Sequence, residues 1–128
     1  GPKVTAGISF LMQTPPPLCT VLEELAGWTF DRTAGIPKSQ RFSFGQRLDG
    51  AILDALLLSV RARYAAADRK RGMLESLNLK VEELRVLWRL VHGREWISRQ
   101  QLFFIQQKLD EAGRMTGGWL RQAAGRAE

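Results

Sequence analysis

The sequence predicts an all-α protein, an antiparallel four-helix bundle, from three observations. Four segments place apolar residues at helical spacing, and no segment shows the period-two alternation that is typical of a half-buried strand. The connections between these segments are short, which favours antiparallel neighbours. The chain has 128 residues, of which 45% are hydrophobic and 25% charged, values typical of one globular domain.

Residues 1–17 are expected to form a flexible N-terminal tail, and residues 18–128 the bundle domain. Three successive prolines, Pro15 to Pro17, favour extended geometry and cannot lie inside a helix. The first two residues, Gly1 and Pro2, are typical of what remains after a purification tag is cleaved.

The first helix is expected from Leu18 to about Phe30, because apolar residues recur along it every three or four positions. The following segment contains Gly35 and Pro37, and both residues interrupt helices.

The second helix is expected to begin at a capping box, Ser43 to Gln46, and to run to about Ala67. Its core face consists of Leu48, Ile52, Ala55, Leu56, Ser59 and Ala62, and this face is widened by Leu53, Leu57 and Val60. The charged run Asp68 to Gly72 predicts the stop after this helix.

The third helix is expected from Met73 to about His92, where Gly93 ends it. Its core face is a heptad seam of Leu74, Leu77, Val81, Leu84, Trp88 and Val91. A second apolar face, opposite this seam, consists of Leu79, Val86 and Leu90. The tail or the first helix would cover this face in one interpretation, and a second subunit in the other. We favour the subunit interface, because the tail is short and rich in proline.

The fourth helix is expected to open with a capping box, Ser98 to Gln101, flanked by a hydrophobic staple of Ile97 and Leu102. Its seam consists of Leu102, Ile105, Leu109, Ala112, Thr116, Trp119 and Ala123. Gly113 and Gly117 have the spacing that lets another backbone come close.

Charge is the unusual feature of the composition. Nineteen Lys and Arg against thirteen Asp and Glu give a net charge of +6, which favours a polyanionic partner. The candidate nucleic-acid-binding residues are Arg61, Arg63, Arg69, Lys70, Arg71, Arg85, Arg89, Arg114 and Arg121. Part of this set also has a structural interpretation, because Glu82 is spaced to neutralise Arg85 and cations at a helix end complement the helix dipole.

No pattern of catalytic residues stands out, so we expect neither an enzyme nor a cofactor. One cysteine, Cys19, and one histidine, His92, cannot supply a Cys/His zinc site, and no phosphate-binding glycine loop is present. No run of apolar residues is long enough for a membrane span, and the N-terminal apolar cluster is too short for a signal peptide. A cytoplasmic location is therefore expected.

Two stretches of the sequence resemble a known family. Residues 36–48 read IPKSQRFSFGQRL, and residues 109–120 read LDEAGRMTGGWL. Together they resemble the Avd (accessory variability determinant) proteins of diversity-generating retroelements, over roughly residues 18–123. Four-helix-bundle proteins encoded as insertions in ribosomal RNA genes are similar in fold, but the Gly-Gly-Trp ending and the excess of arginine favour Avd.

The resemblance implies a barrel-shaped homopentamer of four-helix bundles with a basic character. It also implies binding to a reverse transcriptase and to nucleic acid, RNA or DNA, in support of mutagenic copying of a template RNA, with no catalytic residues in the accessory protein itself. The proline-rich N-terminal extension departs from the family pattern. The alternative is a protein-interaction scaffold of the ribosomal-insertion type with no nucleic-acid role.

Overall fold

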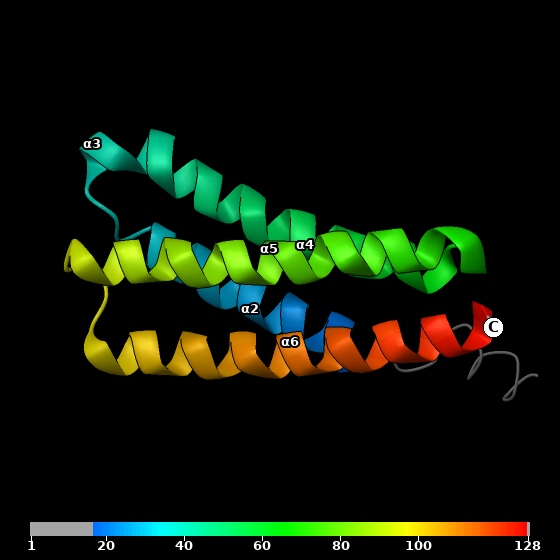
Figure 1. Ribbon diagram of the computed structural model, residues 1–128. Helices are drawn as coiled ribbons and strands as arrows, with labels where there is room; N and C mark the ends of the chain where they lie inside the picture. Colours follow the sequence, from blue (N-terminus) through cyan, green and yellow to red (C-terminus); the bar gives the residue numbers. More distant parts are fainter. Residues whose placement is uncertain (1–16, 128) are drawn as a thin grey trace, which may run out of the picture.

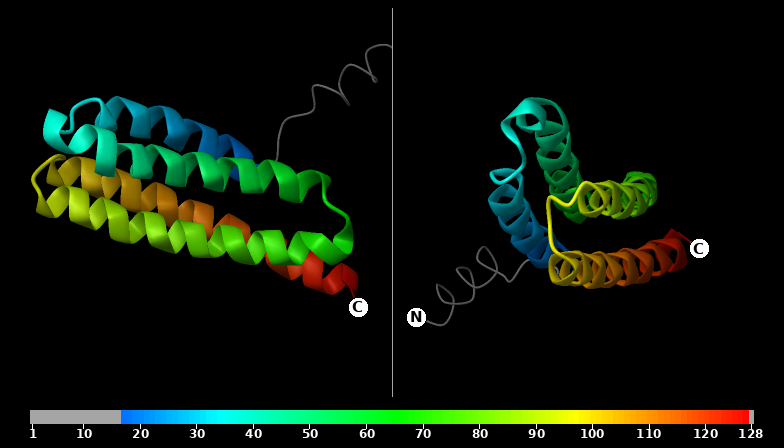
Figure 2. Two further views of the ribbon diagram at one scale, coloured as in Figure 1. Left: turned by 90° about the horizontal axis from the view of Figure 1, so that it is seen from above. Right: turned by 90° about the vertical axis from the view of Figure 1, so that its left-hand side faces the viewer.

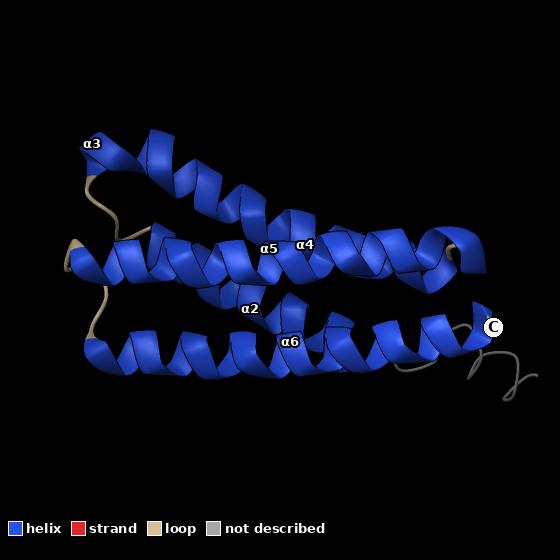
Figure 3. Cartoon of the chain, viewed as in Figure 1, coloured by secondary structure: helices blue, strands red, loops and turns tan. Residues whose placement is uncertain are grey.

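The computed structural model describes residues 17–127, and four long helices account for most of them (Figures 1 and 3). These helices are α2 (Pro17–Thr33), α4 (Gln46–Tyr64), α5 (Ala67–Gly93) and α6 (Arg99–Ala127). No strand occurs within the described range. The predicted all-α class is therefore confirmed. The expected tail lies outside the described residues except for Pro17, which already opens α2 as a proline of the first turn does.

Each long helix packs against two of the others, which makes the molecule an antiparallel four-helix bundle. Helix α2 lies against α4 and α6, and α5 lies against the same two helices (Figure 2). The α5–α6 connection and the short α3 (Lys38–Gln40) lie at one end of the bundle, here named the α5–α6 end (Figure 1). The α4–α5 turn and the C-terminus of α6 lie at the opposite, α4–α5 end.

The core consists of the faces that the helical spacing predicts. All six seam residues of α5 are buried, as are most of the core positions predicted on α4 and α6. Trp88 meets Trp28 of α2 edge to face, with 5.0 Å between ring centroids. This geometry suits the quadrupoles of the two rings, so the tryptophans close the core between α2 and α5.

The second helical unit begins earlier than the sequence suggests, and the capping box at Ser43 is wrong. The helix starts at Lys38, directly after Pro37, and a π-helical segment, η1 (Arg41–Gly45), joins α3 to α4. The Ser43 hydroxyl donates to the Gln40 carbonyl at 3.3 Å and caps no helix. Pro37 sets the start because its fixed backbone angle precedes a helix well and its missing N–H costs nothing there.

The turn between α4 and α5 lies at Ala65 and Ala66, so the predicted stop at Asp68 to Gly72 is also wrong. The charged run forms the first turns of α5 instead. Asp68 lies near the helix N-terminus, where a negative charge complements the dipole, and arginine and lysine are good helix formers. Gly72 is tolerated in the helix at a cost of about 1 kcal/mol.

The start of α6 is as predicted, whereas a residue other than Gly93 occupies the left-handed position after α5. The Ser98 hydroxyl accepts a bond from the Gln101 N–H at 3.1 Å, and the Gln101 side chain accepts from the Ser98 N–H at 2.9 Å, which confirms the capping box. Helix α5 ends in a Schellman motif, because the Trp96 N–H donates to the Val91 carbonyl at 3.1 Å. The left-handed position of that motif is occupied by Glu95, with φ 62°, and not by a glycine.

Candidate nucleic-acid interface

Five of the predicted cations gather at the α4–α5 end. Arg61 and Arg63 lie in the last turn of α4, and the other three, Arg69, Lys70 and Arg71, lie at the start of α5. The two-residue turn brings the two groups to the same end of the bundle (Figure 1). The turn precedes its predicted position, but these five side chains still lie at one end of the bundle.

Aromatic rings are interleaved with the cations of this end. The Arg63 guanidinium lies 5.3 Å from the Tyr64 ring centroid, and the Tyr64 side chain is 75% exposed. The Lys70 ammonium lies 5.9 Å from the Trp119 ring on α6. Tyr64 is exposed and Trp119 is half-buried. Rings beside unpaired cations provide stacking surface and phosphate contacts together, the combination that single-strand binding commonly uses.

Arg121 reaches the same end from α6 and lies against two glycines of its own helix. Its guanidinium lies 3.6 Å from the position that a Cβ would take at Gly117, and 3.8 Å from that position at Gly118. Within the described part of the chain, a Cβ at Gly117 would meet nothing from another helix. An added Cβ at Gly113 would lie 3.2 Å from the Arg85 guanidinium and 3.9 Å from the Val81 side chain of α5. Gly113 therefore faces α5, but neither glycine shows the close backbone approach that the spacing predicts within the described residues.

Arg85 and Arg89, both predicted to bind nucleic acid, have different surroundings in the structure. The Arg85 side chain is only 21% exposed, forms an ion pair with Asp110 of α6, and places its Nε 3.1 Å from Glu82. Its Nη2 lies 3.4 Å from the Leu109 carbonyl, so Arg85 links α5 to α6. Arg89 is exposed and has no ion pair among residues 17–127.

Ion pairs concentrate in the middle of the bundle and unpaired cations toward its ends, with Arg114, beside Glu82 and Asp110, as an unpaired cation in the middle of the described bundle. The middle holds Lys80–Asp54, Lys80–Glu83, Arg85–Glu82, Arg85–Asp110 and Lys108–Glu111. At the α4–α5 end the described residues add only Arg71–Glu75, at 3.1 Å and well exposed. Of the nine predicted cations, only Arg71 and Arg85 are paired within the described range, so the others are available to a polyanion.

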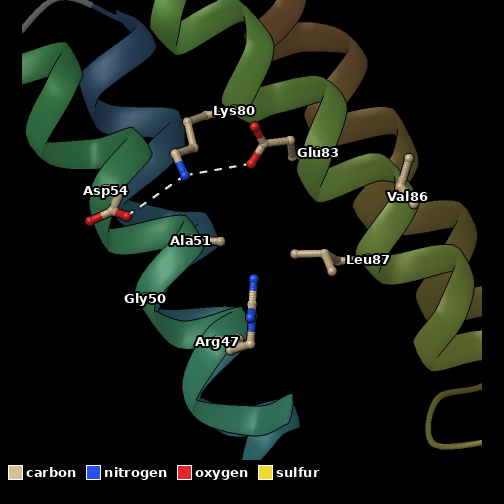
Figure 4. A pocket seen from close by; sticks show the side chains of 8 residues that line it. All are labelled: Arg47, Gly50, Ala51, Asp54, Lys80, Glu83, Val86 and Leu87. Carbon is tan, nitrogen blue, oxygen red and sulfur yellow. Dashed lines mark hydrogen bonds and ion pairs between the residues drawn. The ribbon is translucent and has the colours of Figure 1, made fainter. Parts of the chain in front are cut away.

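A cavity of about 480 Å³ between α4 and α5 is a less suitable site for a polyanion. Lys80 lies 3.8 Å from Asp54 and 3.5 Å from Glu83, and Arg47 points into the same groove (Figure 4). Because both carboxylates border this cavity, its positive charge is largely compensated.

The second apolar face of α5 is exposed, as the interface interpretation requires. Leu79, Val86 and Leu90, here named the α5 stripe, are 60%, 48% and 53% exposed. Helix α2 packs on α4 and α6, so the first helix does not cover the stripe, and the expected tail lies outside the described residues.

A second apolar stripe runs along α4. Leu53, Leu57, Val60 and Tyr64, here named the α4 stripe, follow helical spacing and are 39% to 75% exposed. The first three were expected to widen the core face, but they lie on its solvent side. The chain therefore presents two separate apolar stripes, one on α4 and one on α5.

Aromatic and basic residues also meet at the α5–α6 end, where the sequence did not predict a binding site. Phe44 of η1 lies 5.7 Å from Trp96, and Arg94 lies over the Trp96 ring at 5.8 Å. The signal was present as aromatic residues next to arginines, but the misread helix start assigned Phe44 to a cap.

Other kinds of site have little support in the described chain. Among residues 17–127, no three His, Cys, Asp or Glu side chains are grouped closely enough to hold a metal ion. Cys19 is buried, as expected of a core cysteine. None of the described helices is long and apolar enough to cross a membrane.

Comparison with known proteins gives one match. The family model described as bAvd-like matches residues 18–123, most of the chain. No curated protein and no solved structure matches the chain significantly.

Proposed function

Since this chain belongs to the bAvd-like family of Avd proteins, which are non-catalytic accessory proteins, we propose that it binds a reverse transcriptase and nucleic acid in a diversity-generating retroelement. Its role would be to hold template RNA or its cDNA copy against the polymerase during mutagenic copying. The observation that supports nucleic-acid binding is the concentration of unpaired cations at the α4–α5 end, beside the exposed Tyr64 ring and the half-buried Trp119 ring.

The physical basis of the proposed binding is contact with phosphates. Each phosphate neutralised by an arginine or lysine releases a bound counterion, so affinity depends steeply on salt. Arginine suits this role because its planar guanidinium forms two parallel hydrogen bonds to one phosphate. The protein binds the strand in this way without altering it chemically.

The proposal includes a homo-oligomer, a pentamer by family resemblance. The exposed α5 stripe supports subunit contact, because contiguous apolar side chains on a helix are stabilised when a partner removes them from water. Assembly into a ring would repeat the basic α4–α5 end several times on one particle, and repetition raises avidity for a long polyanion.

A salt titration of RNA binding tests the nucleic-acid role. We compare the double variant Arg61→Gln/Arg69→Gln with Lys80→Gln/Lys108→Gln, which removes the same charge from ion-paired lysines in the middle of the bundle. The first variant should reduce the slope of log affinity against log salt by about 1.4 for a single strand, and the control should leave it unchanged.

Two results would contradict the proposal. Absence of RNA binding at low salt would favour the protein-interaction scaffold, and equal effects of the two double variants would show that only net charge matters. Binding to a reverse transcriptase is tested separately, by co-purification with a reverse transcriptase of a diversity-generating retroelement.

A further inference from the structure

A pocket at the α5–α6 end combines aromatic walls with a cation. The cavity has a volume of about 340 Å³ and is lined by Gln40, Phe44, Leu90, Arg94 and Trp96. The Phe44 and Trp96 rings meet edge to face at an angle of 63°, and the Arg94 guanidinium stands over the Trp96 ring. A flat ring entering this cavity would find aromatic surface, an amide and a guanidinium within one site.

Two unusual backbone segments build the pocket. Phe44 is carried by the π-helical η1, and Gln40 immediately precedes it. Arg94 and Trp96 flank Glu95, the single non-glycine residue of the described chain with positive φ. Both conformations cost free energy relative to regular helix and frequently occur at binding sites. Together they hold aromatic side chains at a place where regular helices would not bring them.

The surroundings of the pocket are positively charged. Beside Arg94, the α5–α6 end carries Lys38, Arg41 and Arg99. None of these four cations forms an ion pair with any residue that the structure describes. Arg41 donates its Nε to the Ile36 carbonyl at 3.3 Å, which leaves its two terminal nitrogens for other acceptors. The cations of this end outnumber its carboxylates, which include Glu95 beside the pocket, so the net charge favours an anionic ligand.

We propose that this pocket binds one unpaired base of a single-stranded nucleic acid, with the adjoining phosphate on Arg94. The assignment rests on the proposed nucleic-acid function and adds to it a second contact region. This region lies at the opposite end of the bundle from the five cations of the α4–α5 end. Aromatic rings accept the face of any base, and paired bases in a duplex cannot enter, so the site selects single strands. An acidic segment of a partner protein would lack the planar surface that fits two aromatic walls.

The pocket also borders the proposed subunit contact. Leu90 belongs to the pocket and ends the α5 stripe. A neighbouring subunit on that stripe would therefore lie beside the pocket, while its aromatic walls come from one chain alone. The test accordingly uses the protein in its native oligomeric state.

The test compares short single-stranded oligoadenylate with its duplex, using fluorescence anisotropy and the variants Phe44→Leu and Arg94→Gln. Phe44→Leu should weaken single-strand binding roughly five- to hundredfold and leave both duplex binding and the salt slope unchanged, because stacking is lost. Arg94→Gln should lower the salt slope by about 0.7, because one phosphate contact is lost. Phe30→Leu, a partly exposed phenylalanine outside the pocket, is the matched control.

Intrinsic fluorescence gives a second measurement that does not depend on the fold of the Phe44 variant. Oligoadenylate should quench the wild-type protein, and Trp96→Phe should lower this quenching, while the part contributed by Trp119 at the α4–α5 end remains. If Phe44→Leu and Arg94→Gln bind with wild-type affinity while Arg61→Gln/Arg69→Gln binds more weakly, the proposed role of the pocket is wrong. The proposed function then stands. No binding by the wild-type protein would overturn the proposed function itself. Loss of reverse-transcriptase capture in Phe44→Leu, with single-strand affinity unchanged, would assign the pocket to a protein segment and overturn the proposal.

Discussion

Two serines, each followed three residues later by a glutamine, have different roles in this chain. Ser98 and Gln101 satisfy each other's backbone N–H groups at the start of α6. Ser43 and Gln46 share the same spacing but lie within a helical unit that has already begun. A capping motif therefore stabilises a helix only where the preceding chain is non-helical, a condition that Pro37 removes at Ser43.

This difference gives a paired prediction. Ser98→Ala removes an acceptor for the Gln101 N–H and should lower the free energy of unfolding by about 1 kcal/mol. Ser43→Ala removes only an exposed hydroxyl bonded to a carbonyl at 3.3 Å and should change the stability by less than about 0.5 kcal/mol. Urea unfolding followed by circular dichroism measures both, and equal losses would contradict the π-helical start of the second unit.

Arg85 and Arg89 provide a second paired prediction. Arg85→Gln breaks the link to Asp110 and Glu82 and should cost about 1–2 kcal/mol of unfolding free energy. Arg89→Gln should leave the stability within about 0.5 kcal/mol of wild type and reduce the salt slope of RNA binding. Thermal unfolding and the salt titration together separate the two roles. If the double variant Arg85→Gln/Arg89→Gln is as stable as the wild type, the Arg85 ion pairs contribute nothing to the stability of the fold.

At the scale of helices, the core faces were predictable and several boundaries were not. The seam of α5 could be read from apolar spacing because burial acts on a whole helix face. The α4–α5 turn could not, since Ala65 and Ala66 favour helix and no proline or glycine marks them. The Asp68–Gly72 run looked like a stop because a charged run and a glycine are typical of helix ends. The same residues also occur inside helices, and tertiary packing decides between the two.

The candidate sites, like the helices, were predictable from the sequence only in part. The arginine cluster was found because its members are close in sequence on either side of the turn. The pocket of Phe44 and Trp96 was missed because its walls are far apart in sequence and depend on the π-helical segment. The pairing of Arg85 with Asp110 was likewise hidden, since it requires the alignment of α5 with α6.

Gly72 tests the revised boundary of α5. In the structure it is an exposed interior helix position, with nothing within 4 Å of an added Cβ. Gly72→Ala should therefore raise the free energy of unfolding by about 1 kcal/mol, because alanine has the higher helix propensity and a less flexible unfolded chain. Had Gly72 occupied a left-handed stop position, the same change would destabilise the protein. A lowered midpoint in thermal unfolding would thus restore the boundary that the sequence suggested.

Over the whole molecule, charge and apolar surface are segregated. Most paired charges lie in the middle of the bundle, most unpaired cations lie toward its two ends, and apolar stripes lie on the outer sides of α4 and α5. This arrangement suits a subunit that contacts its neighbours along its length and a polyanion at its ends. Two different stripes on one chain also permit a head-to-tail contact, in which the α5 stripe of one copy meets the α4 stripe of the next. Head-to-tail contacts close into rings when the rotation between subunits allows.

Sedimentation of two variants distinguishes this arrangement from a symmetric contact. Leu79→Gln/Val86→Gln should dissociate the oligomer, and Phe103→Gln, an exposed apolar residue on α6 outside both stripes, should not. If the contact is head to tail, Leu57→Gln on the α4 stripe should dissociate it as well. An equimolar mixture of the two dissociated variants should then form a dimer and nothing larger, because each pair retains one intact interface. An unchanged oligomer in Leu57→Gln would indicate that α5 stripes meet each other. A wild-type monomer at every concentration would leave both stripes without a subunit role.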